Sequence, residues 1–454
     1  MFQRYYDAGL AQASYLLACT RTRQAVVIDP RRDIDVYVAA ARQHQLTIAA
    51  AIETHVHADF VSGAREFAAL DAQVIAGPGS SLNYQAYDVH HDERLPFGDL
   101  SLQFLHTPGH TPEHISILAR HPGEPDRVFT GDTLFVSAVG RPDLLGASRT
   151  RALAEDLHES LFHILLALDD GVEVHPGHGA GSLCGTGIGG EPHSTIGRER
   201  LSNPMLKYRS REEFVEVVLA DLPETPAYFK RMKSVNQHGA RLLHLAEGFA
   251  GVRTIPPSTA HDAVRNGAVL IDLRPADAFC AEHAEAAINI AFGPGVGYWA
   301  AWVVPAELPV VLMGASEGEA AEVGRQLLRV GLDSVAGFVE GGLGGWRAAG
   351  LPLATLPQID AGELHQRLAR GERITIVDVR TPHEWRGGHI EGSRHVPVGQ
   401  IPGRAHELQH DGLLVTICEG GYRSSLAASL LARAGLPAVA NVTGGMAAYR
   451  AAAT

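Results

Sequence analysis

Two histidines and an aspartate, each separated by one residue, directly follow an apolar run from Leu46 to Ile52. They lie in the motif Thr54-His55-Val56-His57-Ala58-Asp59-Phe60. The apolar run predicts a buried strand that ends in the loop carrying this motif. Because alternate side chains of an extended segment point the same way, His55 and His57 can reach one ion. The motif therefore predicts a metal site at a strand end, with a solvated histidine-rich loop as the alternative.

Three further segments offer metal-ligating side chains in similar surroundings. His110, Asp132 and His178 each follow a short apolar run, and each lies next to a glycine. Glycine lets backbone and side chain approach closely at such a site. Strands that alternate with helices and carry ligands at their ends predict two sheets with helices on the outside. Residues 151–168 are expected to form one of these helices.

The length and charge of the chain limit its organisation and its partners. A chain of 454 residues suggests about three domains. Its net charge of -13 disfavours nucleic acid and anionic membranes as partners. We find no apolar run of about 20 residues that would span a membrane and no secretion signal. The four cysteines form no CxxC pair, which favours a cytoplasmic protein with reduced thiols.

From about residue 252 the sequence repeats itself. The segment Leu270–Arg274 recurs as Ile376–Arg380, and Val339–Arg347 recurs as Val442–Arg450. An offset of about one hundred residues is a domain length rather than a solenoid period. Short buried strands alternate with helices in both copies, which predicts two α/β domains with parallel sheets. The expected domains cover residues 1–250, 252–353 and 358–454.

The second copy carries a loop between an apolar strand and a helix, with the sequence Cys418-Glu419-Gly420-Gly421-Tyr422-Arg423. Loop amides and the positive helix end stabilise a bound anion. With Arg423 they would also stabilise a thiolate, so Cys418 is the predicted nucleophile and residues 419–422 the predicted substrate cradle. The alternative is an inert buried cysteine. The first copy has Gly314 and Glu319 at the positions of Cys418 and Arg423, which predicts that it is catalytically silent.

These motifs resemble two known families. Residues 1 to about 245 resemble the persulfide dioxygenase branch of the metallo-β-lactamase fold, through Thr54–Asp59, Thr107–Thr111, Thr130–Phe135 and Pro176–Gly179. The repeats resemble rhodanese domains, which have four residues between Cys and Arg where the related phosphatases have five. The resemblance implies an αββα sandwich followed by two rhodanese-like α/β domains with parallel sheets, the first silent and the second active. Bacterial persulfide dioxygenase–sulfurtransferase fusions have this organisation.

Phe60 departs from the His-x-His-x-Asp-His pattern of dinuclear zinc enzymes, because a phenyl ring cannot ligate a metal. One ion held by two histidines and a carboxylate is typical of non-heme Fe(II) oxygenases. The resemblance implies one Fe(II) per chain, held by His55, His110 and Asp132, with O2 as co-substrate and zinc as the alternative metal. It places His57, Asp59 and His178 next to these ligands, where hydrogen bonding or direct ligation both remain open.

Other polar groups near these motifs have two interpretations each. Arg141 is expected either to clamp a carboxylate of a thiol cofactor or to form a structural ion pair. Cys184 either lines the substrate channel or takes a persulfide, with no role in the site as the alternative. Cys19 and Cys280 are interpreted as packing residues.

The predicted function is oxidation of a low-molecular-weight thiol persulfide, of the glutathione or coenzyme A type, to sulfite. A Cys418 persulfide would then form or consume thiosulfate, with the direction left open. The alternatives are a glyoxalase II-like zinc thioester hydrolase and a non-catalytic carrier of sulfane sulfur. A homo-oligomer is expected, with the silent domain as an interface or spacer.

Overall fold

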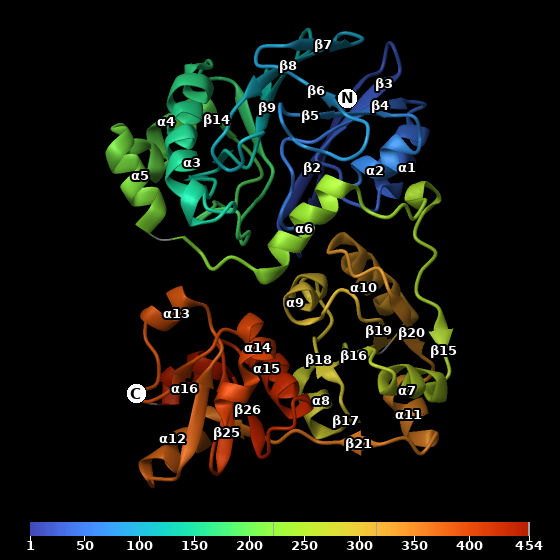
Figure 1. Ribbon diagram of the computed structural model, residues 1–454, viewed down its shortest axis with the longest axis vertical. Coiled ribbons are helices and arrows are strands. Elements are labelled where there is room, and N and C mark those ends of the chain that lie inside the picture. The colour runs from blue at the N-terminus through green and yellow to red at the C-terminus, as the bar shows by residue number, and fades with distance from the viewer. Residues whose placement is uncertain (221, 315, 453–454) are drawn as a thin grey trace. The chain divides into compact units, whose positions relative to one another are not determined.

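The computed structural model describes residues 1–220, 222–314 and 316–452. The chain divides into two compact units, Met1–Phe249 and Ala250–Thr454, each with its own sheets and helices (Figure 1). No helix among the described residues is long and apolar enough to cross a membrane.

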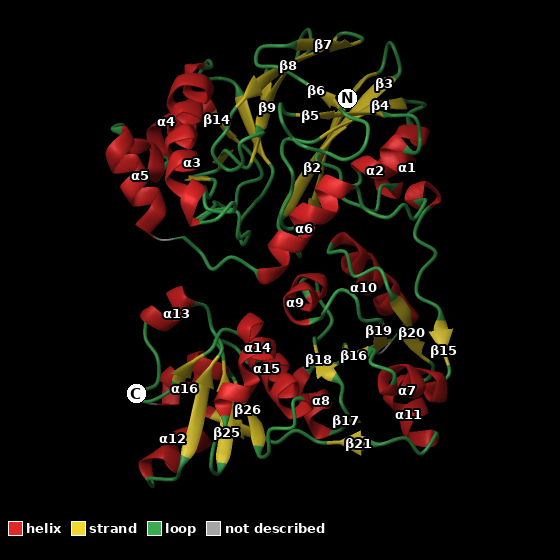
Figure 2. Cartoon of the chain, viewed as in Figure 1, coloured by secondary structure: helices red, strands yellow, loops and turns green. Residues whose placement is uncertain are grey.

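The first unit contains two six-stranded sheets with helices on their outer sides (Figure 2). The first sheet has the order β1-β2-β3-β4-β5-β6, antiparallel from β1 to β3 and parallel from β3 onward. The second has the order β14-β13-β10-β9-β8-β7. The predicted αββα sandwich is thereby confirmed.

The strands of the first sheet are β1 (Phe2–Asp7), β2 (Gln12–Cys19), β3 (Gln24–Ile28), β4 (Thr47–Ile52), β5 (Gln73–Ala76) and β6 (Tyr87–Asp88). Those of the second are β7 (Arg94–Phe97), β8 (Leu100–His106), β9 (Ile115–Arg120), β10 (Arg127–Gly131), β13 (Glu173–Pro176) and β14 (Ser194–Thr195). The helices are α1 (Asp35–Gln43), α2 (Ala64–Ala68), α3 (Ala147–Glu159), α4 (Ile196–Ser202), α5 (Arg211–Ala220) and α6 (Ala227–His238).

The apolar core of this unit lies between the two sheets. Val26 and Ile52 of the first sheet join Phe104 and Ile117 of the second in one fully buried cluster. A second cluster, which includes Leu157 and Phe214, packs α3 and α5 against the outer face of the second sheet. Burial from both sides therefore fixes the strand ends from which the predicted ligands project.

One predicted helix is interrupted, and the interruption lies beside the predicted metal site. In place of a continuous helix over 151–168, α3 ends at Glu159 and a π-helical turn covers Ser160–Ile164. The Ser160 hydroxyl donates to the carbonyl of Pro108 at 2.6 Å, and a Cβ on Gly109 would lie 2.5 Å from Leu157. The helix is therefore packed tightly against the loop that carries His110, and π turns are frequent at such functional sites.

The second unit contains two five-stranded parallel sheets with the same strand order. The first is β15-β20-β19-β16-β18, and the second is β22-β26-β25-β23-β24. All neighbouring strands pair in parallel. This confirms the parallel α/β domains that the sequence repeat predicts.

The first of these sheets is built from β15 (Thr254–Ile255), β16 (Val269–Asp272), β18 (Ile288–Asn289), β19 (Val310–Met313) and β20 (Val335–Val339). Its helices are α7 (Pro257–Arg265), α8 (Ala276–Ala281), α9 (Val296–Val303), α10 (Glu317–Arg329) and α11 (Gly342–Ala348). The second sheet is built from β22 (Gln358–Asp360), β23 (Ile374–Asp378), β24 (Arg394–His395), β25 (Leu413–Ile417) and β26 (Val439–Thr443). Its helices are α12 (Ala361–Ala369), α13 (Pro382–Arg386), α14 (Ile401–Arg404), α15 (Tyr422–Arg433) and α16 (Gly445–Ala452).

Gly77 provides a test of how the two sheets of the first unit meet. It follows β5 of the first sheet, and a Cβ there would lie 1.8 Å from the carbonyl oxygen of Glu113, just before β9 of the second. We expect Gly77→Ala to lower the free energy of unfolding of this unit by about 1–3 kcal/mol, since backbone must move to admit the methyl group. Calorimetry measures the change. Gly171→Ala, whose Cβ meets no atom within 4 Å, is the control, and equal effects of the two substitutions would contradict the packing argument.

Candidate metal centre and active loop

Three predicted ligands converge in the first unit. His55 follows β4, His110 follows β8 and Asp132 follows β10, so the fold brings three strand ends together. The Nε2 atoms of His55 and His110 lie 3.9 and 3.5 Å from Oδ2 of Asp132. All three residues are buried, and none of these three atoms has a hydrogen-bond partner among the described residues. Burying polar atoms in this way is costly unless a further group binds them.

Neighbouring hydrogen bonds orient both imidazoles for ligation. The Thr54 hydroxyl donates to Asp29 at 2.9 Å, so its oxygen accepts from Nδ1 of His55, also at 2.9 Å. Nδ1 of His110 donates to the Arg141 carbonyl at 2.8 Å. In both rings the proton therefore lies on Nδ1 and the lone pair on Nε2.

The protonation states of the three groups suit a cation. Burial lowers the pKa of His55 and of His110, so both rings are neutral, the form that ligates a metal. Burial alone would raise the pKa of Asp132, but the neighbouring His178 outweighs it and holds that pKa well below its ordinary value. Two neutral imidazoles and one carboxylate form the donor set of a metal site with open positions.

His178 and Asp59 lie beside this set and hold Asp132 in place. The Nδ1 and Nε2 atoms of His178 lie 2.8 Å from Asp132 Oδ1 and 2.8 Å from Asp59 Oδ2. Burial lowers the pKa of His178, but the two carboxylates prevail and raise it to about 10. Because both ring nitrogens are engaged, His178 bridges the carboxylates in this structure.

His57 points toward a separate polar cluster. Its Nε2 lies 3.2 Å from Asp29 and 3.1 Å from Glu53, which makes a second buried group of three residues. These carboxylates outweigh burial and raise the pKa of His57 well above its ordinary value. Its ring lies 4.3 Å from that of Phe60, which is fully buried. These two carboxylates hold Nε2 of His57, while its ring lies 4.2 Å from that of His55 and its buried Nδ1 has no hydrogen-bond partner among the described residues.

Arg141 forms an ion pair inside the protein, which is the second of its two interpretations. It is buried and pairs with both carboxylate oxygens of Asp143 at 2.7 and 2.8 Å. Nη1 donates to the carbonyl of Leu183, and Nη2, which also pairs with Asp143, reaches the carbonyl of Pro223 and the hydroxyl of Thr225. With these bonds in place, the guanidinium offers no fork to a substrate carboxylate.

Cys184 lies beside the metal centre without being exposed. Its thiol belongs to a buried group with Asp59 and His178, and its side chain packs against Phe135 and Ala138. Burial and the neighbouring carboxylates raise the pKa of Cys184 well above its ordinary value. The residue is therefore a neutral thiol at physiological pH.

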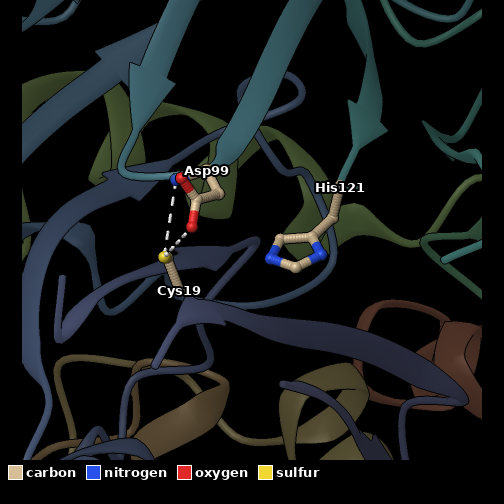
Figure 3. Close-up of side chains that lie close together, drawn as sticks. All are labelled: Cys19, Asp99 and His121. Carbon is tan, nitrogen blue, oxygen red and sulfur yellow. Dashed lines mark hydrogen bonds between the residues drawn. The ribbon is translucent and has the colours of Figure 1, made fainter. Parts of the chain in front are cut away.

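Cys19 lies in a polar setting at the far end of β2 (Figure 3). Its thiol accepts a hydrogen bond from the amide of Asp99 at 3.4 Å, and ligand atoms of Cys19, Asp99 and His121 lie within 4.8 Å of one another. The amide bonds lower the pKa of Cys19 to about 7. Arg21 holds the Asp99 carboxylate in an exposed ion pair, so this cluster already has a cationic partner.

The predicted active loop lies between β25 and α15 in the second unit. The amide of Gly421 donates to the Cys418 sulfur at 3.1 Å, and the thiol donates to the Ser424 hydroxyl at 3.4 Å. Gly421 has φ 103°, a conformation that side chains disfavour. The loop therefore aims an amide at the sulfur, as a cradle for an anion requires.

The C-terminal helix holds this loop from the other side. Met446 of α16 donates its amide to the Cys418 carbonyl at 2.7 Å. A Cβ on Gly445, whose φ is +58°, would lie 2.3 Å from that carbonyl oxygen. This contact explains the glycine at the start of α16, because a larger residue there would displace the loop.

The charged residues of the loop are already paired. Both terminal nitrogens of Arg423 lie 2.7 Å from the Glu384 carboxylate. Glu419 forms ion pairs with Arg380 and Arg450. Tyr422 is partly exposed, and Gly420 has open space at its Cβ position. These two residues form the exposed part of the loop, whereas only 1% of Cys418 is exposed.

The first copy of the loop is built differently. Gly314 follows β19 where Cys418 follows β25, and the side chain of Ser316 caps α10 by accepting the amide of Glu319 at 3.1 Å. Residue 315 lies outside the described residues. A side-chain cap occupies a helix amide that would otherwise bind an anion. The first copy thus lacks both the thiol and one of the free donors.

Several residues of the two sites are not singled out by the sequence. His114 accepts the Asp132 amide at 2.9 Å and so fixes the carboxylate ligand from behind, while Asp29 and Glu53 bind His57. Glu384 pairs with Arg423 from a different element. Only Glu384 has a local signal, since Thr381 and Glu384 form a capping box. The others become neighbours only through the sheet topology.

Comparisons with known proteins agree with this architecture. Residues 8–178 match the family model of the metallo-beta-lactamase superfamily, and residues 257–349 and 360–452 each match that of the rhodanese-like domain. The crystal structure of a metallo-beta-lactamase from Staphylococcus aureus subsp. aureus COL is 32% identical, with a TM-score of 0.66, over 75% of this chain and 98% of that chain.

Two sequence relatives match the first unit. An uncharacterised protein of Mycobacterium tuberculosis is 32% identical over 243 residues, which cover 45% of this chain and 98% of the relative. The cytoplasmic hydroxyacylglutathione hydrolase of Arabidopsis thaliana is 34% identical over 169 residues, which cover 36% of this chain and 62% of the relative.

The sandwich with histidines and an aspartate at its strand ends, the two parallel sheets of equal order and these matches agree with one another. The chain belongs to the metallo-beta-lactamase superfamily and is a fusion of that fold with two rhodanese-like domains.

Proposed function

We propose that this chain oxidises a low-molecular-weight thiol persulfide with O2 at a single non-heme Fe(II) and transfers sulfane sulfur through Cys418. The observation that carries the proposal is the set of three buried ligand atoms of His55, His110 and Asp132. They are two neutral nitrogens and one carboxylate oxygen that have no hydrogen-bond partner within the described part of the chain. This is the donor set that non-heme Fe(II) oxygenases use. Fe(II), when bound, would supply the redox chemistry by which O2 oxidises the terminal sulfur.

The protein's own residues orient the site. The Arg141 carbonyl and the Thr54 hydroxyl keep the imidazole protons on Nδ1, away from the ion. His178 holds Asp132 through its other carboxylate oxygen, and His114 holds the Asp132 amide. Such supporting bonds fix ligand geometry and raise ligand basicity.

The two proposed half-reactions balance. A persulfide RSSH, O2 and water give RSH, bisulfite and one proton. The terminal sulfur loses four electrons to O2, and its bond to the carrier sulfur breaks. At Cys418, sulfur from a second persulfide forms Cys–S–S⁻ and releases RSH. Sulfite then attacks the outer sulfur, the Cys–S bond to it breaks, and thiosulfate leaves with the Cys418 thiolate restored. The reverse direction would supply persulfide and sulfite from thiosulfate and thiol.

The surroundings of Cys418 support the proposed transfer. The Gly421 amide at the Cys418 sulfur would stabilise the thiolate, and the N-terminus of α15 adds its positive end. Glu384 keeps the Arg423 guanidinium next to the loop in a bidentate pair. Thiosulfate and a persulfide anion both fit a site of this charge.

A zinc thioester hydrolase is the second candidate, because a hydroxyacylglutathione hydrolase is among the relatives. Phe60 stands against it, since the aromatic ring replaces a ligand of the second zinc. The carrier interpretation, in which the metal is structural and Cys418 relays sulfur, predicts no consumption of O2.

Oxygen uptake tests both sites at once. Anaerobically iron-loaded protein given glutathione persulfide is expected to consume O2 and to produce thiosulfate. Cys418→Ser should consume O2 at the same rate while sulfite accumulates, because the nucleophile is lost and the metal ligands remain. Uptake is measured by an electrode, and the products by chromatography. No uptake in either protein, with zinc as the stably bound metal, would favour the hydrolase.

Phe60→His tests the single-ion assignment. The added imidazole would stand beside Asp59, so the amount of metal bound should rise from one toward two ions per chain. Mass spectrometry of metals after dialysis gives the ratio. Phe60→Leu, which adds no ligand atom, should stay at one ion. Two ions in the wild-type protein would contradict the assignment.

The Arg423–Glu384 pair predicts a dependence of stability on pH. Burial raises the pKa of Glu384, but Arg423 and the hydrogen bonds from Thr381 outweigh it and lower that pKa to about 2 from an ordinary value of 4.5. The stabilisation is fully present above pH 4.5 and is lost as the pH falls toward 2. Glu384→Gln should lower the Tm at pH 7 and flatten its fall below pH 4.5.

Tryptophan fluorescence measures this change in the second unit, since all four tryptophans lie there. Glu391→Gln, at an exposed position, is the control and should keep the wild-type slope. A wild-type slope in Glu384→Gln would show that the pair contributes nothing to the folded state.

A further inference from the structure

One face of α15, the helix that follows the active loop, is hydrogen-bonded to the first rhodanese-like domain along its whole length. The positions are spaced by three or four residues, so they share one face. Tyr422 donates to the Ala291 carbonyl (3.1 Å), and Arg433 donates to the Ala286 carbonyl (3.2 Å). Between them, Ser425 donates to Oδ1 of Asn289 (2.6 Å), and Ser429 accepts a hydrogen bond from the backbone amide of Asn289 (3.0 Å). The same helix lies beside β18 in Figure 1.

Asn289 is the centre of this contact. It ends β18, and only 2% of it is exposed. Its side-chain amide nitrogen donates to the carbonyl of Asp272 (3.1 Å), the last residue of β16, and to that of Arg274 (2.9 Å), two residues further on. These two bonds fix the orientation of the amide, so Oδ1 must face Ser425 as an acceptor.

Ser425 and Ser429 are buried side chains of this contact. Ser425 is fully buried and Ser429 nearly so, and both lie within three turns of the loop. A buried hydroxyl that loses its partner is costly. A shift of the helix along the first domain would therefore break the bonds that Ser425 and Ser429 form with Asn289.

We propose that Asn289 is a positioning residue for the sulfur-transfer site, through which the first rhodanese-like domain fixes the first turn of α15. The inference rests on the function proposed for Cys418 and extends it, because it makes the first domain part of the site. Gly421, whose amide meets the Cys418 sulfur, directly precedes that turn, and Arg423 lies within it. A small displacement of such groups lowers a reaction rate strongly.

A second contact supports the same role for the first domain. Trp302 of α9 packs on Gly399, where an added Cβ would lie 2.0 Å from the indole ring. Gly399 lies in the turn Val398–Gln400, whose Val398 amide donates to the Val379 carbonyl at the end of β23. The first domain thus supports two segments of the second domain, and this role needs no thiol.

The test uses the full chain and two measurements. The first is sulfur transfer from thiosulfate to cyanide. The second is the rate of Cys418 alkylation by iodoacetamide as a function of pH, followed by mass spectrometry. In Asn289→Ala we expect kcat to fall roughly tenfold. The alkylation profile of Cys418 should also differ from that of the wild type, because the Gly421 amide is less well aimed at the sulfur.

Three variants separate positioning from general destabilisation. Ser425→Ala should reproduce both effects, and the double variant Asn289→Ala/Ser425→Ala should be no worse than either single one. Arg433→Ala removes a contact on the same face at the far end of the helix and should stay within about twofold of the wild type. If Asn289→Ala fails to fold, Ser425→Ala decides, since it leaves the Asn289 bonds to β16 in place.

The two measurements distinguish failure of the role inferred for Asn289 from failure of the proposed sulfurtransferase function. If the wild-type protein transfers no sulfur, the sulfurtransferase function is wrong, and the alkylation profile still decides whether Asn289 positions the loop. Wild-type transfer and an unchanged alkylation profile in Asn289→Ala and Ser425→Ala would overturn the inference. Equal effects of Arg433→Ala and Asn289→Ala on both measurements would overturn it as well.

Discussion

The polar network of the first unit is arranged around three buried ligand atoms that have no hydrogen-bond partner among the described residues. Nε2 of His55, Nε2 of His110 and Oδ2 of Asp132 face one another inside the protein. A buried polar atom without a hydrogen bond costs about 1–3 kcal/mol. The surrounding residues do not relieve this cost, since Thr54, the Arg141 carbonyl and His178 engage only the opposite sides of the same groups. A bound cation would satisfy all three atoms together, so the polar network around them is organised for an ion.

The loop at Cys418 has the opposite character, because it presents a hydrogen-bond donor to the sulfur instead of a set of metal-ligating atoms. Cys418 is met by a backbone amide, and its loop leads into a helix N-terminus. The side-chain charges next to it are neutralised in pairs, Arg423 with Glu384 and Glu419 with Arg380 and Arg450. Oriented amides therefore provide the local positive potential. This explains why the loop is rich in glycine, which lets amides converge on a sulfur.

Local sequence was most informative where one segment carries a complete signal. The strand, the glycine loop and the helix around Cys418 are consecutive, so their arrangement follows from the order of residues. The repeat predicted two parallel sheets because both copies keep the same strand pattern. Arg141 shows the opposite case: the sequence left a substrate clamp and an ion pair open, and the nearby Asp143 was no guide to the bonds with Pro223 and Thr225. The π turn at Ser160 also depends on a distant partner, the Pro108 carbonyl.

By itself the sequence determined the fold families, the Cys418 loop with its thiol-free counterpart, and the ligand types available to a metal. The tertiary structure decided which of those ligands meet. It gave Nε2 of His57 two carboxylate partners of its own, while Nε2 of the neighbouring His55 faces His110 and Asp132. It also brought His114 to the backbone amide of Asp132, and Asn289 to Ser425 of α15. The physical reason is that hydrogen bonds and packing between distant segments form only once the sheets are assembled, whereas a loop between a strand and a helix carries its geometry within a few residues.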